Sequence, residues 1–219
     1  DQFGRDIFAR VAAGVANSAL IAVVAVAFAT VVGTLAGVDA GFYRGASDAV
    51  ISGVTNVLFA FPPLLLALSL ASVLDRNWFT IAVAIAIVYV PIFIRVTRGP
   101  VLSLREIEYV KAAVSTGASR VAIMFRHVLP NITSIVIVQV TLSLSWAVLT
   151  EASLSFLGLG APPPAPSLGS MIYESRTLVS IAPWTMAAPG VVIVLFVVGL
   201  NLLGDGLRDS LDPRNRGTK

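Results

Sequence analysis

The sequence predicts an all-α protein, a polytopic bundle of membrane-spanning helices. Of its 219 residues, 57% are hydrophobic and 12% are charged, about half the charged fraction of a typical soluble domain. Long uncharged segments recur along the chain, and about 20 such residues are enough to cross a hydrocarbon core as a helix. We therefore expect five spans within a single membrane domain, residues 17–204.

The composition excludes several kinds of site. The chain has no cysteine, which removes disulfide scaffolds, thiol nucleophiles and cysteine metal sites. No basic run is interleaved with aromatic residues, so nothing supports nucleic-acid binding. The single histidine, His127, has no matching acidic constellation for catalysis. We expect no catalytic residue, no metal site and no cofactor bound by this chain.

Residues 1–16 are predicted to lie at the membrane surface, outside the first span. Phe3, Ile7, Phe8 and Val11 recur at helical spacing opposite charged residues, which is typical of an interfacial helix. Acidic residues flank the basic ones, which argues against a signal peptide. The sequence lacks an initiator methionine, so we expect it to begin inside a longer protein.

The first span is predicted over residues 17–38, where Asn17 and Ser18 can cap a helix. Small residues then repeat at every fourth position, which allows a second backbone to approach closely. The alternative is that these glycines only mark the end of the span and a loop. The four glycines are Gly33, Gly37, Gly41 and Gly45.

The second span, residues 49–74, is interrupted by Pro62 and Pro63. Two prolines remove two backbone donors, so the helix has to kink or break. In lipid such a break is tolerated only where protein or water satisfies the freed carbonyl groups. Pro62 and Pro63 are therefore candidates for lining a translocation path, and a simple packing kink is the equal alternative.

Three further spans are predicted over residues 77–95, 131–157 and 184–204. A Gly/Pro-rich loop and a short amphipathic helix at residues 170–180 connect the last two spans. A polar tail, residues 205–219, follows.

Glu151 is the one acidic residue well inside a predicted span. An ionised carboxylate there costs about 2.5–3.5 kcal/mol on insertion scales unless it is paired or hydrated. We therefore expect Glu151 to face the bundle interior. It is a candidate for the translocation path, and the alternative is a structural hydrogen bond to the following turn.

The charged stretch between the third and fourth spans, residues 104–131, is called here the helical loop. Ile107, Val110 and Val114 form one apolar stripe, which predicts a short helix. Gly117 can end that helix by adopting a positive φ. Ser119 can cap a second short helix, which we expect Pro130 to separate from the fourth span. On physical grounds alone, the pair either docks on a protein or lies on lipid headgroups.

The distribution of basic residues predicts the topology. If the helical loop is cytoplasmic, alternate connections and the C-terminal tail are cytoplasmic too. The four remaining basic residues, Arg5, Arg10, Arg76 and Arg176, are then outside. The positive-inside rule favours this orientation, which puts residue 1 outside and implies one more span upstream, six in the full protein. The 11 basic residues on the cytoplasmic side are Arg44, Arg95, Arg98, Arg105, Lys111, Arg120, Arg126, Arg208, Arg214, Arg216 and Lys219.

The spacing of Lys111-Ala112-Ala113, Gly117 and Leu129-Pro130 resembles the EAA signature of bacterial ABC importer permeases. In that signature two alanines precede a glycine by five and four residues, and Leu-Pro follows at twelve and thirteen. Further segments resemble the second permease subunit of the dipeptide/oligopeptide branch. These segments are FGRDIFAR, AGFYRG, FAFPPLLLAL, TEASLSFLGLGAPPPAPSLG and GDGLRDSLDPR.

The resemblance implies a type I importer permease in the bacterial cytoplasmic membrane, embedded in membrane lipid. It implies a homologous second permease subunit, two ATPase subunits that bind the ATP and Mg²⁺, and an extracytoplasmic binding protein that selects the ligand. This chain has no phosphate-binding GxxxxGK[ST] loop of its own. Short peptides are the expected substrate, with nickel chelates or another small solute as alternatives.

The resemblance also implies that a coupling loop, residues 98–130, docks on an ATPase through residues 106–130. Lys111 departs from the glutamate of the signature, and Glu108 can supply an acidic contact instead. His127 stands at the isoleucine position, where we expect a capping or partner contact. The candidate coupling residues are Glu108, Tyr109, Lys111, Ala112, Ala113, Gly117, Ala118, Arg120, His127, Leu129 and Pro130.

An ion-coupled secondary transporter is the competing class of function. It needs ionisable residues within the spans, and only Glu151 qualifies. A membrane enzyme ranks third, because it needs a cluster of titratable residues on one membrane face.

Overall fold

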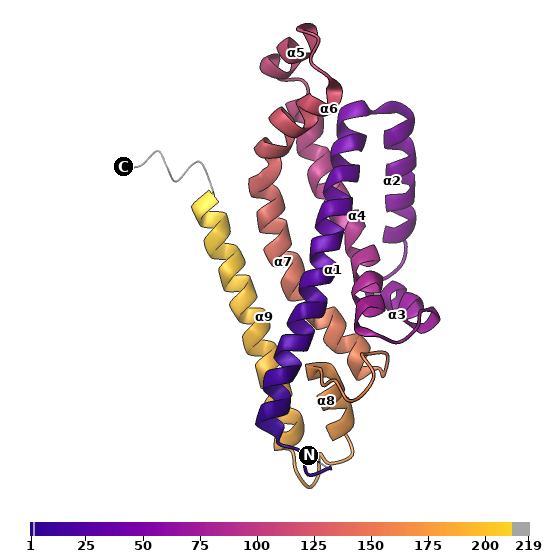
Figure 1. The fold of residues 1–219 in the computed structure, drawn as a ribbon, viewed down its shortest axis with the longest axis vertical. Helices are drawn as coiled ribbons and strands as arrows, with labels where there is room; N and C mark the ends of the chain where they lie inside the picture. Colours follow the sequence, from indigo (N-terminus) through magenta and orange to yellow (C-terminus); the bar gives the residue numbers. More distant parts are fainter. Residues whose placement is uncertain (2, 212–219) are drawn as a thin grey trace.

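A computed structural model describes residues 1 and 3–211 and shows an elongated bundle of helices (Figure 1). No β-strand occurs in this part of the chain. The elements, in order, are α1 (Ile7–Tyr43), α2 (Gly45–Phe59), α3 (Pro63–Val73), α4 (Trp78–Leu104), α5 (Glu108–Ser115), α6 (Arg120–Ile123), the π-helical turn η1 (Met124–Val128), α7 (Leu129–Phe156), α8 (Leu168–Ser175) and α9 (Trp184–Leu211).

Four helical segments of the described chain are long and apolar enough to cross a membrane. They are α1, α4, the continuous segment Arg120–Phe156 and α9. The pair α2 and α3 is apolar enough as well but is bent by 93°, which is the geometry of a broken span or a re-entrant loop, so the described chain has four or five spans. The all-helical membrane fold expected from the uncharged segments is confirmed.

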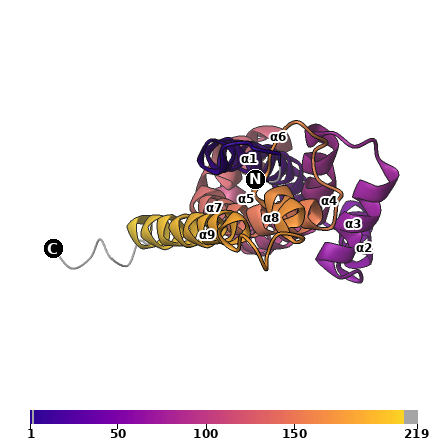
Figure 2. The same ribbon diagram turned by 90° about the horizontal axis from the view of Figure 1, so that it is seen from below.

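The core is formed by α1, α4 and α7, which pack on one another along their lengths. Helix α9 packs on α7, while α2 and α3 stand at the periphery of α4 (Figures 1 and 2). Helix α8 lies at the end that holds residue 1, and α5 lies at the opposite end. The C-terminal end of α9 points toward the α5 end (Figure 1).

Helix α1 approaches α4 closely through three of the four repeating glycines. A Cβ added to Gly33 would lie 2.5 Å from Phe93 Cβ, and one added to Gly41 would lie 2.9 Å from Val101 Cβ. A Cβ on Gly37, between them, would collide with the hydroxyl of Thr97. The close approach is confirmed for these three. Gly45 lies past the helix end with φ +62° and nothing within 4 Å of its Cβ position.

The first helix begins ten residues earlier than the sequence predicts. Instead of a separate interfacial segment over residues 1–16, α1 runs unbroken from Ile7. The Asp6 carboxylate accepts a hydrogen bond from the Ala9 N–H at 2.8 Å and caps the helix there. Because no helix-breaking residue lies between Ile7 and Asn17, the two predicted pieces merge. Asn17 is not a cap, and its amide donates to the Pro166 carbonyl at 2.8 Å.

The chain breaks at the double proline, as expected, but continues through single prolines. Pro62 adopts an extended conformation, with ψ 129°, because the residue before a proline is excluded from the helical region. By contrast, α4 contains Pro91 and Pro100 and extends to Leu104, beyond the predicted end at residue 95. A single proline removes only one donor, and packing against neighbouring helices maintains the rest of a membrane helix.

Pro130 does not separate the second short helix from the fourth span, contrary to the sequence prediction. The π-helical turn η1 precedes it, and the Leu129 N–H bonds to the Met124 carbonyl five residues earlier. The Asn131 side-chain amide donates to the His127 carbonyl. This carbonyl at the bulge therefore has a hydrogen-bond partner. A π-bulge accommodates the proline in this way, so residues 120–156 form one continuous helix.

The remaining boundaries differ by a few residues. Helix α8 is shorter than the predicted segment 170–180 and begins after Ser167, whose hydroxyl accepts from the Ser170 N–H. Helix α9 continues to Leu211, so the predicted tail begins inside it. Residues 212–219, with Arg214, Arg216 and Lys219, lie outside the described residues.

We predict that Gly37→Ala destabilises the protein by about 1–3 kcal/mol or more, because the added methyl group overpacks the α1–α4 contact. Gly53→Ala in α2 is the matched control, since nothing lies within 4 Å of its Cβ position. The measurement is the thermal unfolding of the purified protein in detergent. Equal melting temperatures for the two variants would contradict the close approach of α1 and α4.

Candidate functional site

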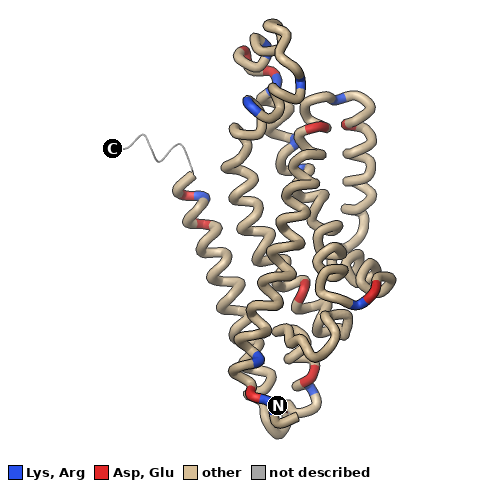
Figure 3. The backbone as a smooth tube through the Cα atoms, viewed as in Figure 1, with Lys and Arg blue, Asp and Glu red and all other residues tan. Residues whose placement is uncertain are grey.

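The helical loop projects from one end of the bundle, beyond the C-terminal end of α1 (Figure 1). Lys and Arg residues gather at this end of the backbone, and few charged residues lie along the middle of the long helices (Figure 3). The C-terminal end of α9 lies toward the same end. The loop is therefore held outside the apolar part of the bundle.

Two contacts anchor the helical loop to the bundle. The Val110 side chain on α5 is 1% exposed and packs with Val38 and Val101 from α1 and α4. The Arg105 guanidinium donates to the Phe42 carbonyl at the end of α1, at 2.7 Å. An eight-residue helix is marginal in isolation, so these contacts hold α5 in place.

A glycine corner separates α5 from α6. Gly117 has φ +81°, and the Ala118 N–H bonds back to the Ala113 carbonyl at 3.2 Å, which is a Schellman-type closure. The Ser119 hydroxyl then accepts from the Ala122 N–H at 3.2 Å. Both the glycine stop and the serine cap are confirmed.

The outer surface of the helical loop carries small side chains. Ala112, Gly117 and Ala118 are exposed, as are Glu108 and Arg120, whereas Ala113 is half-buried against the core. Glu108 makes no ion pair with another described residue. Small side chains leave the backbone open to close approach by another protein.

Leu129 and Pro130 do not join this outer surface. Both lie at the start of α7, and Leu129 packs against the core cluster that includes Val128 and Ile132. Pro130 is exposed, and both residues continue the helix after η1; their part in docking stays a prediction.

Tyr109 and His127 lie together on one side of α5. Their ring centroids are 6.1 Å apart, and the Asn131 amide donates to the Tyr109 hydroxyl at 3.2 Å. His127 is thus in contact with α5, and it is only half-exposed. The arrangement braces α5 against η1.

On the other side of α5, Lys111 pairs with Glu106 at 3.1 Å. The hydrogen bond from the Lys111 ammonium holds the pKa of the Glu106 carboxyl below its usual value. Sequence reasoning missed Glu106 because the two residues are five apart, which is not a helical neighbour spacing. The turn before α5 brings them together.

The proposed path residues lie elsewhere. Pro62 and Pro63 are exposed at the 93° bend between α2 and α3. Neighbouring apolar side chains are exposed too, with Phe61 at 53% and Leu65 at 56%. These prolines lie at the exposed bend, whereas Glu151 is buried inside the bundle.

Glu151 is fully buried in α7. Its carboxylate accepts a hydrogen bond from the Ser155 hydroxyl, one turn later, at 2.6 Å. The hydroxyls of Ser18 on α1 and Ser167 before α8 also approach the carboxyl group. Its second carboxyl oxygen is buried without a hydrogen-bond partner among the described residues. The bond to Ser155 agrees with the structural alternative, and the place of Glu151 on a path stays a prediction.

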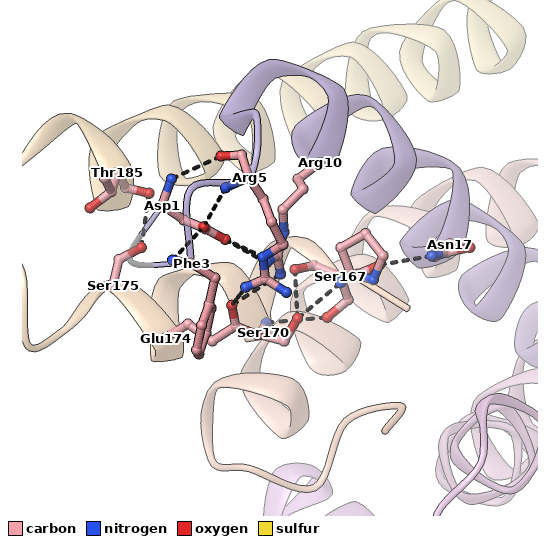
Figure 4. Close-up of polar contacts among 11 residues, drawn as sticks. Asp1, Phe3, Arg5, Arg10, Asn17, Ser167, Ser170, Glu174, Ser175 and Thr185 are labelled. Carbon is pink, nitrogen blue, oxygen red and sulfur yellow. Dashed lines mark hydrogen bonds and ion pairs between the residues drawn. The ribbon is translucent and has the colours of Figure 1, made fainter. Parts of the chain in front are cut away.

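A second polar cluster joins residue 1 to α8 at the opposite end (Figure 4). Arg10 bridges Asp1 at 2.7 Å and Glu174 at 3.0 Å. Arg5 contacts the same two carboxylates. The segment predicted to lie on the membrane surface is thus tied to the loop between the last two spans.

The described residues contain no group of three or more His, Asp or Glu side chains that could hold a metal ion.

A model of the family described as "Binding-protein-dependent transport system inner membrane component" matches residues 29–217. The dipeptide transport system permease protein DppC of Alkalihalophilus pseudofirmus is 45% identical over 98% of this chain and 70% of that protein. The glutathione transport system permease protein GsiD of Pectobacterium atrosepticum is 42% identical over 98% of this chain and 71% of that protein.

Two solved structures share the fold. The inward-facing MetNI methionine ABC transporter has a chain with a TM-score of 0.73 at 20% identity, covering 91% of this chain and 94% of its own. An amino acid ABC transporter with histidines has a TM-score of 0.68 at 13% identity, covering 93% and 95%. The fold is that of type I importer permeases.

We predict that Gly117→Val loosens the corner, because a left-handed backbone costs a residue with a side chain about 1–2 kcal/mol. Limited trypsin digestion should then cut faster after Lys111 and Arg120 while the melting temperature stays unchanged. Gly117→Asn is the control, since asparagine tolerates this conformation. If trypsin cleaved Gly117→Val and the wild type at equal rates, the predicted backbone strain at residue 117 would be contradicted.

We predict that Glu151→Gln keeps assembly and uptake in the reconstituted transporter, because the amide oxygen still accepts from Ser155. Glu151→Ala should lose about 1–3 kcal/mol, since it leaves buried hydroxyls without an acceptor. Melting temperature and substrate uptake are the two measurements. Lost uptake with intact assembly in Glu151→Gln would instead place the residue on the path.

Proposed function

This chain belongs to the family of binding-protein-dependent transport system inner membrane components, and we propose that, as an ABC importer permease, it moves short peptides across the cytoplasmic membrane. The observation that carries the coupling part of this proposal is the anchored, small-residue surface of the helical loop. The relatives named for dipeptide and glutathione transport support a peptide substrate. Nickel chelates or another small solute are the alternative cargo.

The helical loop is proposed to dock on an ATPase subunit. Ala112, Gly117 and Ala118 present little side-chain volume, so a groove on the partner can close around the backbone of α5. Arg105 and Val110 fix α5 to the ends of α1 and α4. A force on α5 would thereby be transmitted directly to α1 and α4, as coupling to ATP hydrolysis requires. ATP and Mg²⁺ would be bound by the ATPase.

A second, homologous permease subunit is proposed to cover the α2–α3 side. The bend at Pro62 and Pro63 interrupts the helix within the apolar region, and its side chains are exposed. Irregular backbone is tolerated at membrane depth only where protein or water contacts it. A partner subunit with a water-filled path between the two chains provides both. An extracytoplasmic binding protein would deliver the peptide.

We propose that the helical loop and the C-terminal end of α9 face the cytoplasm. They lie at one end of the bundle in Figure 1, and the basic residues gather around the loop in Figure 3. Four arginines of the described chain belong to the other side, and two of them, Arg5 and Arg10, are neutralised by Asp1 and Glu174. The positive-inside rule supports this orientation.

Ala112→Arg should release the ATPase from the purified complex, because the long side chain blocks close contact at the outer surface of α5. Ala13→Arg, an exposed alanine near the opposite end of α1, is the control and should retain the ATPase. Co-purification and peptide-stimulated ATP hydrolysis with the binding protein are measured. Normal ATPase retention in Ala112→Arg would refute the docking surface.

The same assay tests the substrate. Short peptides should stimulate ATP hydrolysis by the complex with its binding protein, whereas nickel chelates should not. Stimulation by a nickel chelate alone would replace the peptide proposal by the alternative cargo.

A further inference from the structure

A cleft of about 400 Å³ opens between the helical loop and the end of α1. Phe42 and Tyr43 at the C-terminal end of α1 form one wall, and Lys111 on α5 and Arg120 on α6 lie across from them. The cleft lies where a membrane-spanning helix ends, which is the level of lipid headgroups. The α5 residues that line it are Val110, Lys111, Val114 and Ser115, and neither Ala112 nor Gly117 is among them.

The cleft carries excess positive charge. Arg105, Lys111 and Arg120 line it, against the single carboxylate of Glu106. Glu106 is already engaged, since it lies 3.1 Å from Lys111 and 3.6 Å from Arg105. Arg120 has no acidic partner among the described residues, and its guanidinium stacks over the Tyr43 ring with 5.7 Å to the centroid. An anion entering the cleft would therefore meet unneutralised donors.

An apolar groove of about 320 Å³ lies deeper in the membrane between α1 and the segment from η1 to α7. Val31 and Leu35 line it from α1, and Phe125 from η1, and these side chains are 59%, 43% and 57% exposed. The hydroxyl of Thr34, which also lines the groove, is buried and has no hydrogen-bond partner among the described residues.

The groove and the cleft are on one seam. Leu35 is seven residues before Phe42 and eight before Tyr43, so they share a face of α1 about two turns apart, or about 12 Å along the axis. On the other side of the seam, Arg120 is followed one turn later by Phe125. A basic cleft at the membrane surface thus stands above an apolar groove.

We infer that this seam binds an anionic phospholipid, with its headgroup phosphate in the cleft and an acyl chain in the groove. Basic pockets at the ends of membrane helices recognise such headgroups. Arg105, Lys111 and Arg120 supply donors to the phosphate oxygens, and the exposed side chains of Val31, Leu35 and Phe125 contact the acyl chain. The inference requires only that the chain is inserted in a membrane. Placing the lipid in the cytoplasmic leaflet rests, in addition, on the proposed orientation.

A lipid fits the seam better than an acidic side chain of a partner protein does. A carboxylate could occupy the cleft, but it would leave the apolar groove beneath exposed. A lipid carries an anionic headgroup and a long apolar chain in one molecule. The headgroup matches the basic cleft, and the chain matches the apolar groove beneath it. A bound lipid would also link α5 to α1, at the joint that Arg105 makes.

The test uses the purified complex, stripped of lipid, in native mass spectrometry. Dioleoyl phosphatidylglycerol and dioleoyl phosphatidylcholine are titrated separately, and the affinity of each is measured. Phosphatidylglycerol should bind more tightly to the wild type, and Arg120→Gln should weaken that binding about fivefold without changing the phosphatidylcholine affinity. Leu35→Trp, which fills the groove, should also weaken phosphatidylglycerol binding.

Arg176→Gln is the matched control. Arg176 stacks over the Tyr173 ring at 4.0 Å, a similar contact near the other end of the bundle, so its loss should leave the phosphatidylglycerol affinity unchanged. An unchanged affinity in Arg120→Gln would overturn the inference. Displacement of the lipid by millimolar inorganic phosphate would also overturn it and indicate a free-phosphate site.

Loss of the ATPase in Arg120→Gln with unchanged lipid affinity would assign the cleft to the partner protein instead. The lipid readout does not depend on ATP hydrolysis. Failure of the lipid site and failure of the proposed transport function are therefore separate results.

Discussion

The contact between α1 and α4 is the constraint on which the rest of the bundle depends. Gly33, Gly37 and Gly41 bring the two backbones together, and Phe93, Thr97 and Val101 occupy the space that side chains on α1 would take. In a membrane, apolar helices gain nothing by hiding from lipid, so association rests on close packing of this kind. The pair forms a stiff unit, and α7 packs against both of its helices.

The helical loop is attached to the same stiff unit at its end. Val110 is inserted between side chains from α1 and α4, and the Arg105 guanidinium binds the last turn of α1. A displacement of α5 therefore acts on α1 and α4 together. The continuous helix from α6 through η1 to α7 gives a second rigid connection from the loop into the membrane. This geometry is the basis of the proposed coupling role of the helical loop.

The other side of the bundle is held differently. Helix α2 has one buried residue, Thr55, and it is fastened to α4 by the bidentate contact of Arg98 with Asp48, at 2.6 and 2.7 Å. With so little packing around it, the bent α2–α3 unit is the part of the chain best placed to meet a second subunit and to move. Rigid coupling on one side and a loosely packed broken span on the other are consistent with alternating access.

The sequence by itself determined the helical class, the four long spans, the glycine face of α1, the break at Pro62 and Pro63, and the caps of the helical loop. Hydrophobic length, small-residue spacing and local turn chemistry act over a few residues. Only the tertiary structure decided that Pro130 continues a helix through η1, that Glu106 pairs with Lys111, and that Glu151 is fully buried. These depend on which distant segments pack together. Packing supplies the contacts that a helix with a proline or a buried carboxylate needs. The spacing of neighbouring residues in the sequence does not predict which distant residues make these contacts.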